Sequence, residues 1–346
     1  MSTSYTWPDI LTGLVRREGL EATAATWALN EILSGRASEV QIAAMLTALR
    51  AKGETEDEIA GLADAMLNNS TPISLNPDAV DVVGTGGDRA NTVNVSTMAA
   101  IVAAGAGAKV VKHGSRAASS QSGTADTLEA LGVNLEVDPS KQAGILDEAG
   151  ISFLFAAMYH PAMKEVAGVR RKLGIQTTFN FLGPLANPAR PRAMALGVAN
   201  DDIAPVIARV LAERGTRGMV FRGFDGLDEL TTTSESDVWL IAEGRVFRTV
   251  LDPRGLGLQP SSPFELEGGP PEHNAQVVRD VVAGKPGPVR DIVVLNAAAA
   301  LLAYRGISTV TELIEQMRPA LEAANESIDS GSAARTLETW IAATNR

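Results

Sequence analysis

The sequence predicts an α/β protein, in which a small helical N-terminal domain is hinged to a large α/β domain with a mainly parallel central sheet flanked by helices. Three observations support this fold class. The first 75 or so residues have apolar positions at helical spacing. From residue 80, short β-branched runs alternate with helical segments. Helical patterns then continue from about residue 275 to the C-terminus.

The N-terminal module is predicted to be helical throughout. Ser38 is followed three residues later by Gln41, and Thr55 by Glu58, so two helix starts carry capping boxes. The segment 68–78, NNSTPISLNPD, contains two prolines and three asparagines and is expected to be a linker. The apolar positions at helical spacing are Ile10, Leu11, Leu14, Val15, Leu29, Ile32, Leu33, Ile59, Leu62, Ala63 and Met66.

The next part of the chain is predicted to form a sheet covered by helices. The segment 160–192 begins with a helical pattern and ends in a stretch with three prolines, and we expect it to return to the helical module. The expected domains are therefore 1–75 with this return, and 76–346. Expected strands are VDVV at 80–83, KVV at 109–111, SFLF at 152–155, MVF at 219–221 and VWLI at 238–241, and a Gly- and Pro-rich connection at 252–274 leads to helices near 275–283, 289–304, 309–326 and 332–343.

Composition excludes several classes of function. A net charge of −11 argues against a broad nucleic-acid surface, because phosphate backbones are bound mainly through Lys and Arg. The absence of cysteine excludes disulfides, thiolate metal sites and cysteine nucleophiles. The N-terminus has no secretory signal pattern, and the longest apolar run, 292–304, is shorter than the roughly 20 residues that span a bilayer. We therefore expect a cytoplasmic protein that does not bind membranes.

The first candidate site follows the first expected strand, where GTGGD at 84–88 precedes NVST at 94–97. Glycine lets a backbone approach a ligand closely, and a helix N-terminus offers free N–H groups to an anion, so this segment indicates a phosphate site. It has neither the Lys of a P-loop nor the dinucleotide fingerprint, since Asp88 and Arg89 interrupt the glycines. The alternative is a strand-to-helix turn with Asn94 or Ser96 as its N-cap.

The second candidate site follows the next strand, in KHGSRAASSQSGTADTLEALG at 112–132. Lys112, His113 and Arg116 bring positive charge beside several hydroxyl groups, a combination suited to anionic oxygens. The alternative is that Lys112 and Arg116 are exposed charges and that His113 is a core histidine bonded to a backbone carbonyl.

Two further groups are weaker signals. Asp228 and Glu229 are adjacent carboxylates in GFDGLDELTTT, and on a loop both can face Mg²⁺, which prefers oxygen ligands shared with substrate phosphates. A surface acidic pair is the alternative. Arg170 and Arg171, with His160 upstream, suggest a site for a carboxylate, whereas an ion pair with Glu165 is the structural alternative.

These motifs occur in the order GTGGD…NVST, KHG.R..SS.SG.AD.LEALG, VRR.LG, FN.LGPL.NP and DGLDE, and together they cover nearly the whole chain. In this respect the sequence resembles the anthranilate phosphoribosyltransferase family. The resemblance implies a homodimeric enzyme of tryptophan biosynthesis, with a fold of the nucleoside phosphorylase and phosphoribosyltransferase class. It implies transfer of a phosphoribosyl group from phosphoribosyl pyrophosphate (PRPP) to anthranilate with Mg²⁺, expected as two ions.

The resemblance also implies roles for individual residues. Asp228, Glu229 and Lys112 would be catalytic, and Ser96, Asp228 and Glu229 would bind the metal. Gly84, His113, Ser115, His160 and Arg170 would contact anthranilate. The residues matching the family's PRPP contacts are Gly84, Gly87, Asp88, Thr92, Asn94, Val95, Ser96, Thr97, Lys112, His113, Gly114, Ser115, Arg116, Ala117, Ala118, Ser119, Ser120 and Thr124.

Two positions depart from the family pattern. Ser115 stands where the family usually has Asn, which bears on the acceptor contact, and Arg89 stands where Gly is common. The rival functions are a pyrimidine nucleoside phosphorylase, which shares the architecture but lacks the KHG.R motif, and a non-catalytic nucleic-acid-binding relative, against which the acidic composition and the DGLDE motif argue.

Overall fold

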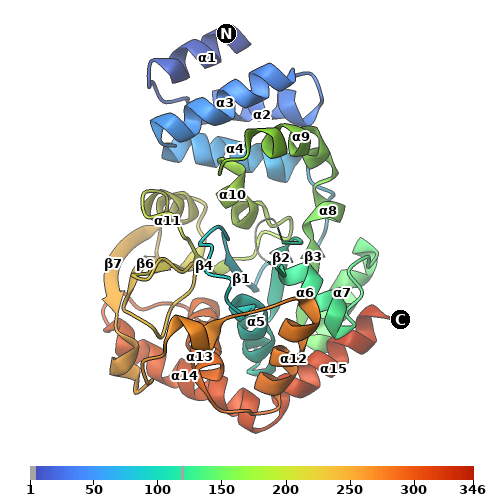
Figure 1. Cartoon of the computed structure of the whole chain (residues 1–346), viewed down its shortest axis with the longest axis vertical. Coiled ribbons are helices and arrows are strands. Elements are labelled where there is room, and N and C mark those ends of the chain that lie inside the picture. The colour runs from blue at the N-terminus through green and yellow to red at the C-terminus, as the bar shows by residue number, and fades with distance from the viewer. Residues whose placement is uncertain (1–4, 118–120) are drawn as a thin grey trace. The chain divides into compact units, whose positions relative to one another are not determined.

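The computed structural model describes residues 5–117 and 121–346 and divides into two compact units (Figure 1). The first unit comprises Met1–Pro72 and Ala156–Pro188, and the second comprises Ile73–Phe155 and Ala189–Arg346. The first boundary lies three residues before the expected one, and the return segment begins and ends about four residues earlier than 160–192. Each unit is therefore built from two separate stretches of chain.

The first unit is entirely helical. In the packing of these helices, α2 lies against α4, α1 against α3, and α9 against α3 and α2. Both expected capping boxes are confirmed, at Ser38 and Thr55. Its α-helices are α1 Trp7–Val15, α2 Ala22–Leu33, α3 Glu39–Lys52, α4 Glu56–Asn68, α8 Ala156–Tyr159, α9 Lys164–Leu173 and α10 Phe179–Leu182, with short 3₁₀ helices at Pro161–Met163 and Gly183–Ala186.

The return segment is bonded to the N-terminal helices of its own unit. The Thr71 amide donates to the Tyr159 carbonyl at 2.7 Å, and the Thr178 hydroxyl donates to the buried Glu54 carboxylate at 2.6 Å. The predicted stripe on α4 is buried, whereas Val15 at the end of α1 is 77% exposed. The apolar pattern of α1 therefore covers a wider face than the core of the unit uses.

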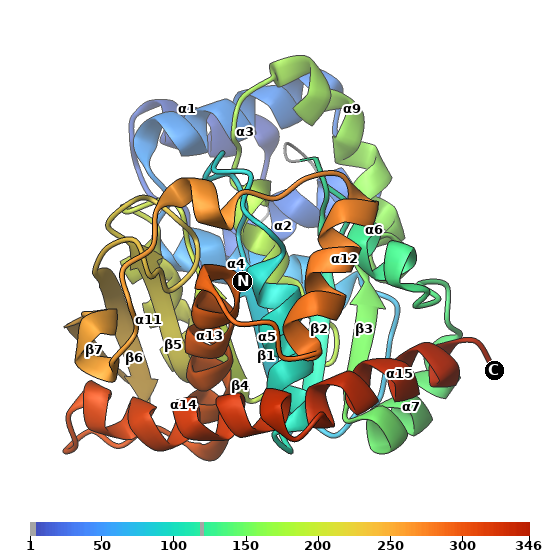
Figure 2. The ribbon, with the colours of Figure 1, turned by 60° about the horizontal axis from the view of Figure 1, so that its bottom comes forward.

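The second unit contains a seven-stranded sheet in the order β3-β2-β1-β4-β5-β6-β7 (Figure 2). The first five strands in this order are parallel, and β6 and β7 are antiparallel to their neighbours. The strands are β1 Val80–Gly84, β2 Val110–Gly114, β3 Ile151–Phe155, β4 Ala193–Gly197, β5 Arg217–Gly223, β6 Ser236–Ala242 and β7 Arg245–Leu251.

Two of these strands, β4 and β7, are not among the predicted ones. β4, AMALG, has no β-branched residue, and it is a strand because it is buried between β1 and β5 at all five positions. β7 forms a hairpin with β6 through Glu243 and Gly244, which have φ values of +53° and +70°. Two positive φ angles are typical of a type I′ turn, for which a Glu is an uncommon first residue.

Helices cover the sheet of the second unit. The small side chains of α5 let it pack closely against α13, and both helices lie on the sheet. In Figure 2, α14 and α15 lie beneath these two helices. The helices are α5 Val95–Gly105, α6 Thr124–Leu131, α7 Gln142–Ala149, α11 Ala204–Glu213, α12 Pro271–Val282, α13 Pro288–Arg305, α14 Leu313–Asp329 and α15 Ser332–Thr344, with 3₁₀ turns at Pro139–Lys141, Pro253–Leu256 and Pro263–Leu266.

The predicted fold class is confirmed: a helical unit accompanies an α/β unit with a mainly parallel sheet. Within residues 5–117 and 121–346, none of the helices combines the length and the hydropathy that crossing a lipid bilayer requires.

Candidate active site

The centre of the second unit has a topological switch point between β1 and β4. From β1 the chain continues through α5 to β2 on one side, and from β4 it continues through α11 to β5 on the other. Right-handed connections place α5 and α11 on opposite faces of the sheet, so the loops after β1 and β4 diverge. Ligands of open α/β sheets bind in the crevice that this divergence leaves at the carboxyl ends of the strands.

Two glycines end the strands at this point. Gly84 of β1 and Gly197 of β4 are partners in the register of the sheet. A Cβ on Gly84 would lie 2.2 Å from Oδ2 of Asp228, and a Cβ on Gly197 would lie 1.6 Å from the Asp228 carbonyl oxygen. The absence of both side chains therefore makes the space that Asp228 occupies.

The loop that carries Asp228 and Glu229 is held by its own hydrogen bonds. Asp225 Oδ1 accepts from the Leu227 amide at 3.1 Å, and its Oδ2 accepts from the Thr231 hydroxyl at 2.8 Å. Behind the loop, Asn296 of α13 accepts from the Leu230 amide at 3.0 Å and donates to the Leu230 carbonyl at 2.8 Å. The adjacent carboxylates therefore stand on a fixed turn, and both are buried, which excludes the surface acidic pair.

Four residues form a polar cluster at this site: Ser96, Lys112, Asp228 and Glu229. Lys112 is 1% exposed, and its Nζ donates to the Ser96 hydroxyl at 3.1 Å and to the Val82 carbonyl. The Ser96 amide, in the first turn of α5, donates to the Glu229 carboxylate. The Gly86 amide donates to Asp228 Oδ2 at 2.6 Å. The exposed-charge alternative is therefore wrong for Lys112.

Burial dominates the electrostatics of the cluster. It raises the pKa of Asp228 to about 7, and the neighbouring charge of Asp88 contributes to the increase. Burial and the charge of Asp228 likewise raise the pKa of Glu229, which Lys112 partly offsets. Burial lowers the pKa of Lys112, against the charges of Asp81, Glu229 and Asp228. A divalent cation would favour the ionised carboxylates, so this donor set fits Mg²⁺.

The first loop (residues 84–94) has an unusual backbone. Gly86, Gly87, Arg89 and Asn91 all have positive φ, between +52° and +89°. Glycine adopts this region without steric cost, whereas other L-residues are strained there. Arg89, at φ +63°, occupies the position where the resembled family commonly has Gly, so the departure has a conformational cost in this chain.

The described parts of the second loop (residues 114–117 and 121–123) are joined by Asp126 of α6. Asp126 Oδ2 accepts from the Ala117 and Gly123 amides, both at 2.9 Å, and its Oδ1 accepts from Arg116 at 3.0 Å. Burial opposes ionisation of Asp126, but the two amides and Arg116 together lower its pKa. The predicted residues Ala118, Ser119 and Ser120 lie outside the described residues.

The other residues that match the family's PRPP contacts lie in or next to the same two loops. Asn94 occupies the N-cap position of α5, but its side chain makes no capping bond and instead contacts the second loop. The buried Thr97 hydroxyl has no hydrogen-bond partner among the described residues. Of the remainder, Val95 and His113 are buried, Asp88, Thr92, Gly114, Ala117 and Thr124 are half-buried, and Ser115 is exposed.

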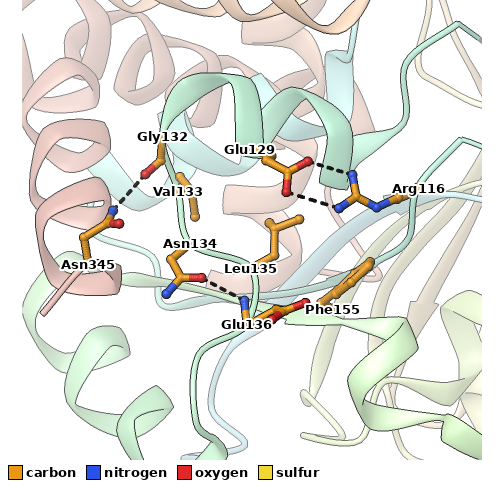
Figure 3. Close-up of a pocket in the computed structure, with 9 residues that line it drawn as sticks. All are labelled: Arg116, Glu129, Gly132, Val133, Asn134, Leu135, Glu136, Phe155 and Asn345. Carbon is orange, nitrogen blue, oxygen red and sulfur yellow. Dashed lines mark hydrogen bonds and ion pairs between the residues drawn. The ribbon is translucent and has the colours of Figure 1, made fainter.

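Arg116 is bound by acidic neighbours. Its guanidinium pairs with Asp126 and Glu129 and lies 5.6 Å from the centre of the Phe155 ring. It lines a pocket of about 420 Å³ at the edge of the unit, shown in Figure 3 with the Arg116–Glu129 pair. Two carboxylates, Glu129 and Glu136, line the pocket and Arg116 is already paired with the first of them, so the pocket does not suit a polyanionic ligand. As the alternative to a ligand role predicts, Arg116 is an exposed charge, and acidic side chains pair with it.

The predicted carboxylate site lies in the first unit. Arg170 of α9 is half-buried, with its guanidinium 5.6 Å from the centre of the Phe179 ring. Burial lowers its pKa, and no carboxylate among the described residues contributes a charge that would raise it. Glu165, the suggested ion-pair partner, lies instead near Gly35. Arg170 therefore has a cationic group with no acid paired to it in the described chain, whereas Arg171 is exposed.

His160, the other predicted anthranilate contact in this segment, is bonded to the backbone of its own unit. Its Nε2 is 2.9 Å from the Ala186 carbonyl and donates a hydrogen bond to it. The residue is buried, and burial lowers its pKa, so the ring is neutral at physiological pH.

Sequence reasoning missed several residues that position the site. Gly197 belongs to an unpredicted strand, and Asp225 looks like an ordinary turn residue. Asp81 and Asn296 carry a usable signal, because each is a polar residue within an otherwise apolar segment, VDVV and IVVLNAAAALLAY. Both are at most 1% exposed.

Comparisons with known proteins agree with this architecture. The family described as "Glycosyl transferase family, helical bundle domain" matches residues 8–70, and "Glycosyl transferase family, a/b domain" matches residues 76–334. Anthranilate phosphoribosyltransferase from Arthrobacter sp. (strain FB24) is 54% identical over 339 residues, which cover 98% of this chain and 96% of that protein.

Solved structures give the same result. The crystal structure of anthranilate phosphoribosyltransferase from Thermus thermophilus has a TM-score of 0.90 and 39% identity, covering 98% of this chain and all of that one. The Saccharomyces cerevisiae enzyme in complex with PRPP and Mg has a TM-score of 0.88 and 31% identity, covering 98% of both chains. On this sequence identity and coverage, the chain belongs to the anthranilate phosphoribosyltransferase family.

Proposed function

We propose that the polar cluster and the two loops bind PRPP, and that Asp228, Glu229 and Lys112 activate it. As a family member, the enzyme transfers the phosphoribosyl group from PRPP to anthranilate, giving N-(5-phosphoribosyl)anthranilate and pyrophosphate in tryptophan biosynthesis. The observation that carries the site assignment is the convergence of Ser96, Lys112, Asp228 and Glu229 at the switch point.

Magnesium fits the carboxylate side of this cluster. Two buried carboxylates with raised pKa values stand beside a serine hydroxyl, and Mg²⁺ commonly binds through one or two carboxylates together with substrate phosphates. When bound, the metal neutralises negative charge on the diphosphate. We assign Ser96, Asp228 and Glu229 as its ligands and propose two ions.

The chain's own residues would position the donor and stabilise the leaving group. Lys112 places a buried ammonium beside the acidic pair, and the glycines of the first loop let its backbone approach the phosphates closely. As the bond from the anomeric carbon to pyrophosphate breaks, negative charge develops on the leaving oxygen. The fixed positive charge and hydrogen-bonding groups of the site stabilise that charge, so no covalent protein nucleophile is needed.

Arg170 would bind the carboxylate of anthranilate. Its planar donors match a carboxylate, and its partial burial strengthens such a pair. The anthranilate amine then forms the new bond to the anomeric carbon, and the resulting cationic nitrogen loses a proton to solvent water. Because this aromatic amine is weakly basic, it attacks as the neutral species without a strong general base.

The assembly and location follow the family expectation. We propose a homodimer in the cytoplasm, with α1 and α3 of the helical unit as the contact. In support, Val15 of α1 and Val40 of α3 are 77% and 78% exposed, although the two helices pack together.

A coupled assay tests the function. With PRPP, Mg²⁺ and anthranilate, the wild-type protein should consume anthranilate, followed as loss of its fluorescence. The variant with Asp228→Ala and Glu229→Ala should lose Mg²⁺-dependent turnover while remaining folded. Asp237→Ala removes a buried carboxylate of β6 that is paired with Arg248 of β7, and this variant should keep Mg²⁺-dependent turnover.

The same preparation separates the rival functions. Full activity in the double variant would refute the metal assignment. Phosphorolysis of thymidine or uridine in place of anthranilate consumption would indicate a pyrimidine nucleoside phosphorylase, and a salt-dependent gel shift without turnover would indicate a nucleic-acid-binding relative.

A further inference from the structure

The connection before α12 runs alongside the first loop of the second unit. Thr92 and Glu267 form an antiparallel bridge, the Val93 amide donates to the Leu266 carbonyl at 3.0 Å, and the Gly268 amide donates to the Asn91 carbonyl at 2.7 Å. A Cβ on Gly268 would lie 2.8 Å from the Thr92 carbonyl oxygen. This connection is therefore bonded closely to the segment that leads into NVST.

Asn274, in the first turn of α12, adds a side-chain link. It is 3% exposed, its Oδ1 accepts from the Gly269 amide at 2.8 Å, and its Nδ2 donates to Asn94 Oδ1 at 2.9 Å. Thr127 of α6, fully buried, also donates to Asn94 Oδ1, at 2.6 Å. Asn94 Nδ2 in turn donates to the Ser122 carbonyl at 3.3 Å.

The direction of these bonds is fixed at both ends. A backbone N–H can only donate, so the Gly269 amide requires the Asn274 oxygen on its side and leaves the Asn274 NH₂ for Asn94. A backbone carbonyl can only accept, so Ser122 requires the Asn94 NH₂ and leaves Asn94 Oδ1 for Asn274 and Thr127. A single arrangement of donors therefore satisfies the whole group.

The group joins three segments that are far apart in the sequence. It ties the N-cap of α5 to the end of the second loop, to α6 and to α12. Two residues after Asn94, Ser96 bonds to both Lys112 and Glu229. The position of the Asn94 backbone therefore affects the polar cluster directly.

We propose that Asn274 is a positioning residue for PRPP binding, which acts with Thr127 through the Asn94 side chain to set the first and second loops. This inference rests on the proposed donor site. It also assigns a role to the Asn94 side chain, whose polar atoms hold the two loops together.

Donor affinity measured without the acceptor tests the proposal. Calorimetric titration of the full-length protein with PRPP and Mg²⁺ should give a dissociation constant about tenfold higher for Asn274→Ala than for wild type, or about 1.4 kcal/mol. Thr127→Val should raise the dissociation constant for PRPP several-fold, whereas Thr127→Ser, which keeps the hydroxyl, should have the wild-type value. KM for anthranilate should not change in any of these variants.

Ser327→Ala is the matched control. Ser327 of α14 is 2% exposed and donates to the Val102 carbonyl at 2.8 Å, at the other end of α5. This variant should lower the melting temperature without changing donor affinity, as a purely structural bond would. If Asn274→Ala does not fold, the donor affinity of Thr127→Val distinguishes a positioning role of this group from a purely structural one.

A donor dissociation constant within twofold of wild type in the folded variants would overturn the role of Asn274. That outcome is distinct from failure of the proposed function, which would appear as absence of donor binding by the wild-type protein and would overturn both. Non-additive effects in the Asn274→Ala and Thr127→Val double variant would support action through one shared acceptor, Asn94 Oδ1.

Discussion

The Gly84→Ala substitution tests whether the ends of the central strands shape the carboxylate site. The added Cβ would lie 2.2 Å from Asp228 Oδ2, whereas ordinary contacts begin at 3.4 Å. The carboxylate must therefore shift by more than about 1 Å. This shift disrupts the hydrogen bond that Asp228 Oδ2 accepts from the Gly86 amide at 2.6 Å. Backbone on the other side, at Gly197, prevents Asp228 from moving as a whole.

The expected magnitude follows from that hydrogen bond. A bond to a charged group contributes about 1.5–3 kcal/mol, which corresponds to a factor of about ten to more than one hundred in binding. We expect the Mg²⁺ concentration for half-maximal turnover to rise at least about tenfold, with a matching loss of turnover at low Mg²⁺. The measurement is a Mg²⁺ titration of anthranilate consumption at saturating PRPP.

Gly144→Ala is the control for this experiment. Gly144 lies in α7 with no atom within 4 Å of an added Cβ, so the variant should keep wild-type Mg²⁺ dependence. Its unfolding free energy should increase by up to about 1 kcal/mol, because Ala favours a helix interior over Gly. Wild-type Mg²⁺ dependence in Gly84→Ala would refute the reasoning about Asp228.

Four further outcomes are expected. Arg170→Gln should raise KM for anthranilate at least about tenfold and leave KM for PRPP unchanged; equal effects on both would argue against carboxylate binding. Asn296→Leu should cost about 2–5 kcal/mol in urea unfolding, because the Leu230 amide and carbonyl lose their partners; a loss below about 1 kcal/mol would contradict this. Arg89→Gly should stabilise the fold by up to about 1 kcal/mol by relieving a positive φ, and a lower melting temperature would count against it. The pKa of Asp126 is lowered in the folded state, so its stabilising contribution is present above the unfolded pKa of about 3.9 and disappears as the pH falls through the folded value. The stability difference between wild type and Asp126→Asn should therefore be constant from pH 7 to 5 and shrink below about pH 4, and a difference that does not change with pH would contradict the assignment.

Much of the fold could be predicted because local patterns agree with tertiary packing. The capping boxes at Ser38 and Thr55, the apolar stripe of α4 and the β-branched core of β1 all indicate the observed element. β4 could not be predicted, because AMALG has no strand propensity of its own and depends on its neighbours β1 and β5. Its place in the middle of the sheet overrides its local preference.

The site shows the same division. Glycine clusters after strands and the adjacent carboxylates mark Gly84, Lys112, Asp228 and Glu229 as candidates, and the structure gathers them at one point. Burial separates Lys112 from Arg116, which the sequence treats alike. The sequence marks Asn296 as a polar residue in an apolar segment, but it does not reveal that its partner is Leu230. The contact of Asn274 with Asn94 likewise spans too long a sequence distance to leave a local pattern.

The discontinuous units constrain how the chain can fold during synthesis. Val80 in β1 pairs with Ala193 in β4, so the middle of the sheet cannot form until the ribosome has released the whole helical excursion between β3 and β4. The helical unit is likewise incomplete until Pro188 emerges. Closing such long loops is slow, and β1 remains an open edge in the meantime. A nascent chain stopped before β4 should therefore depend on chaperones more than the finished protein does.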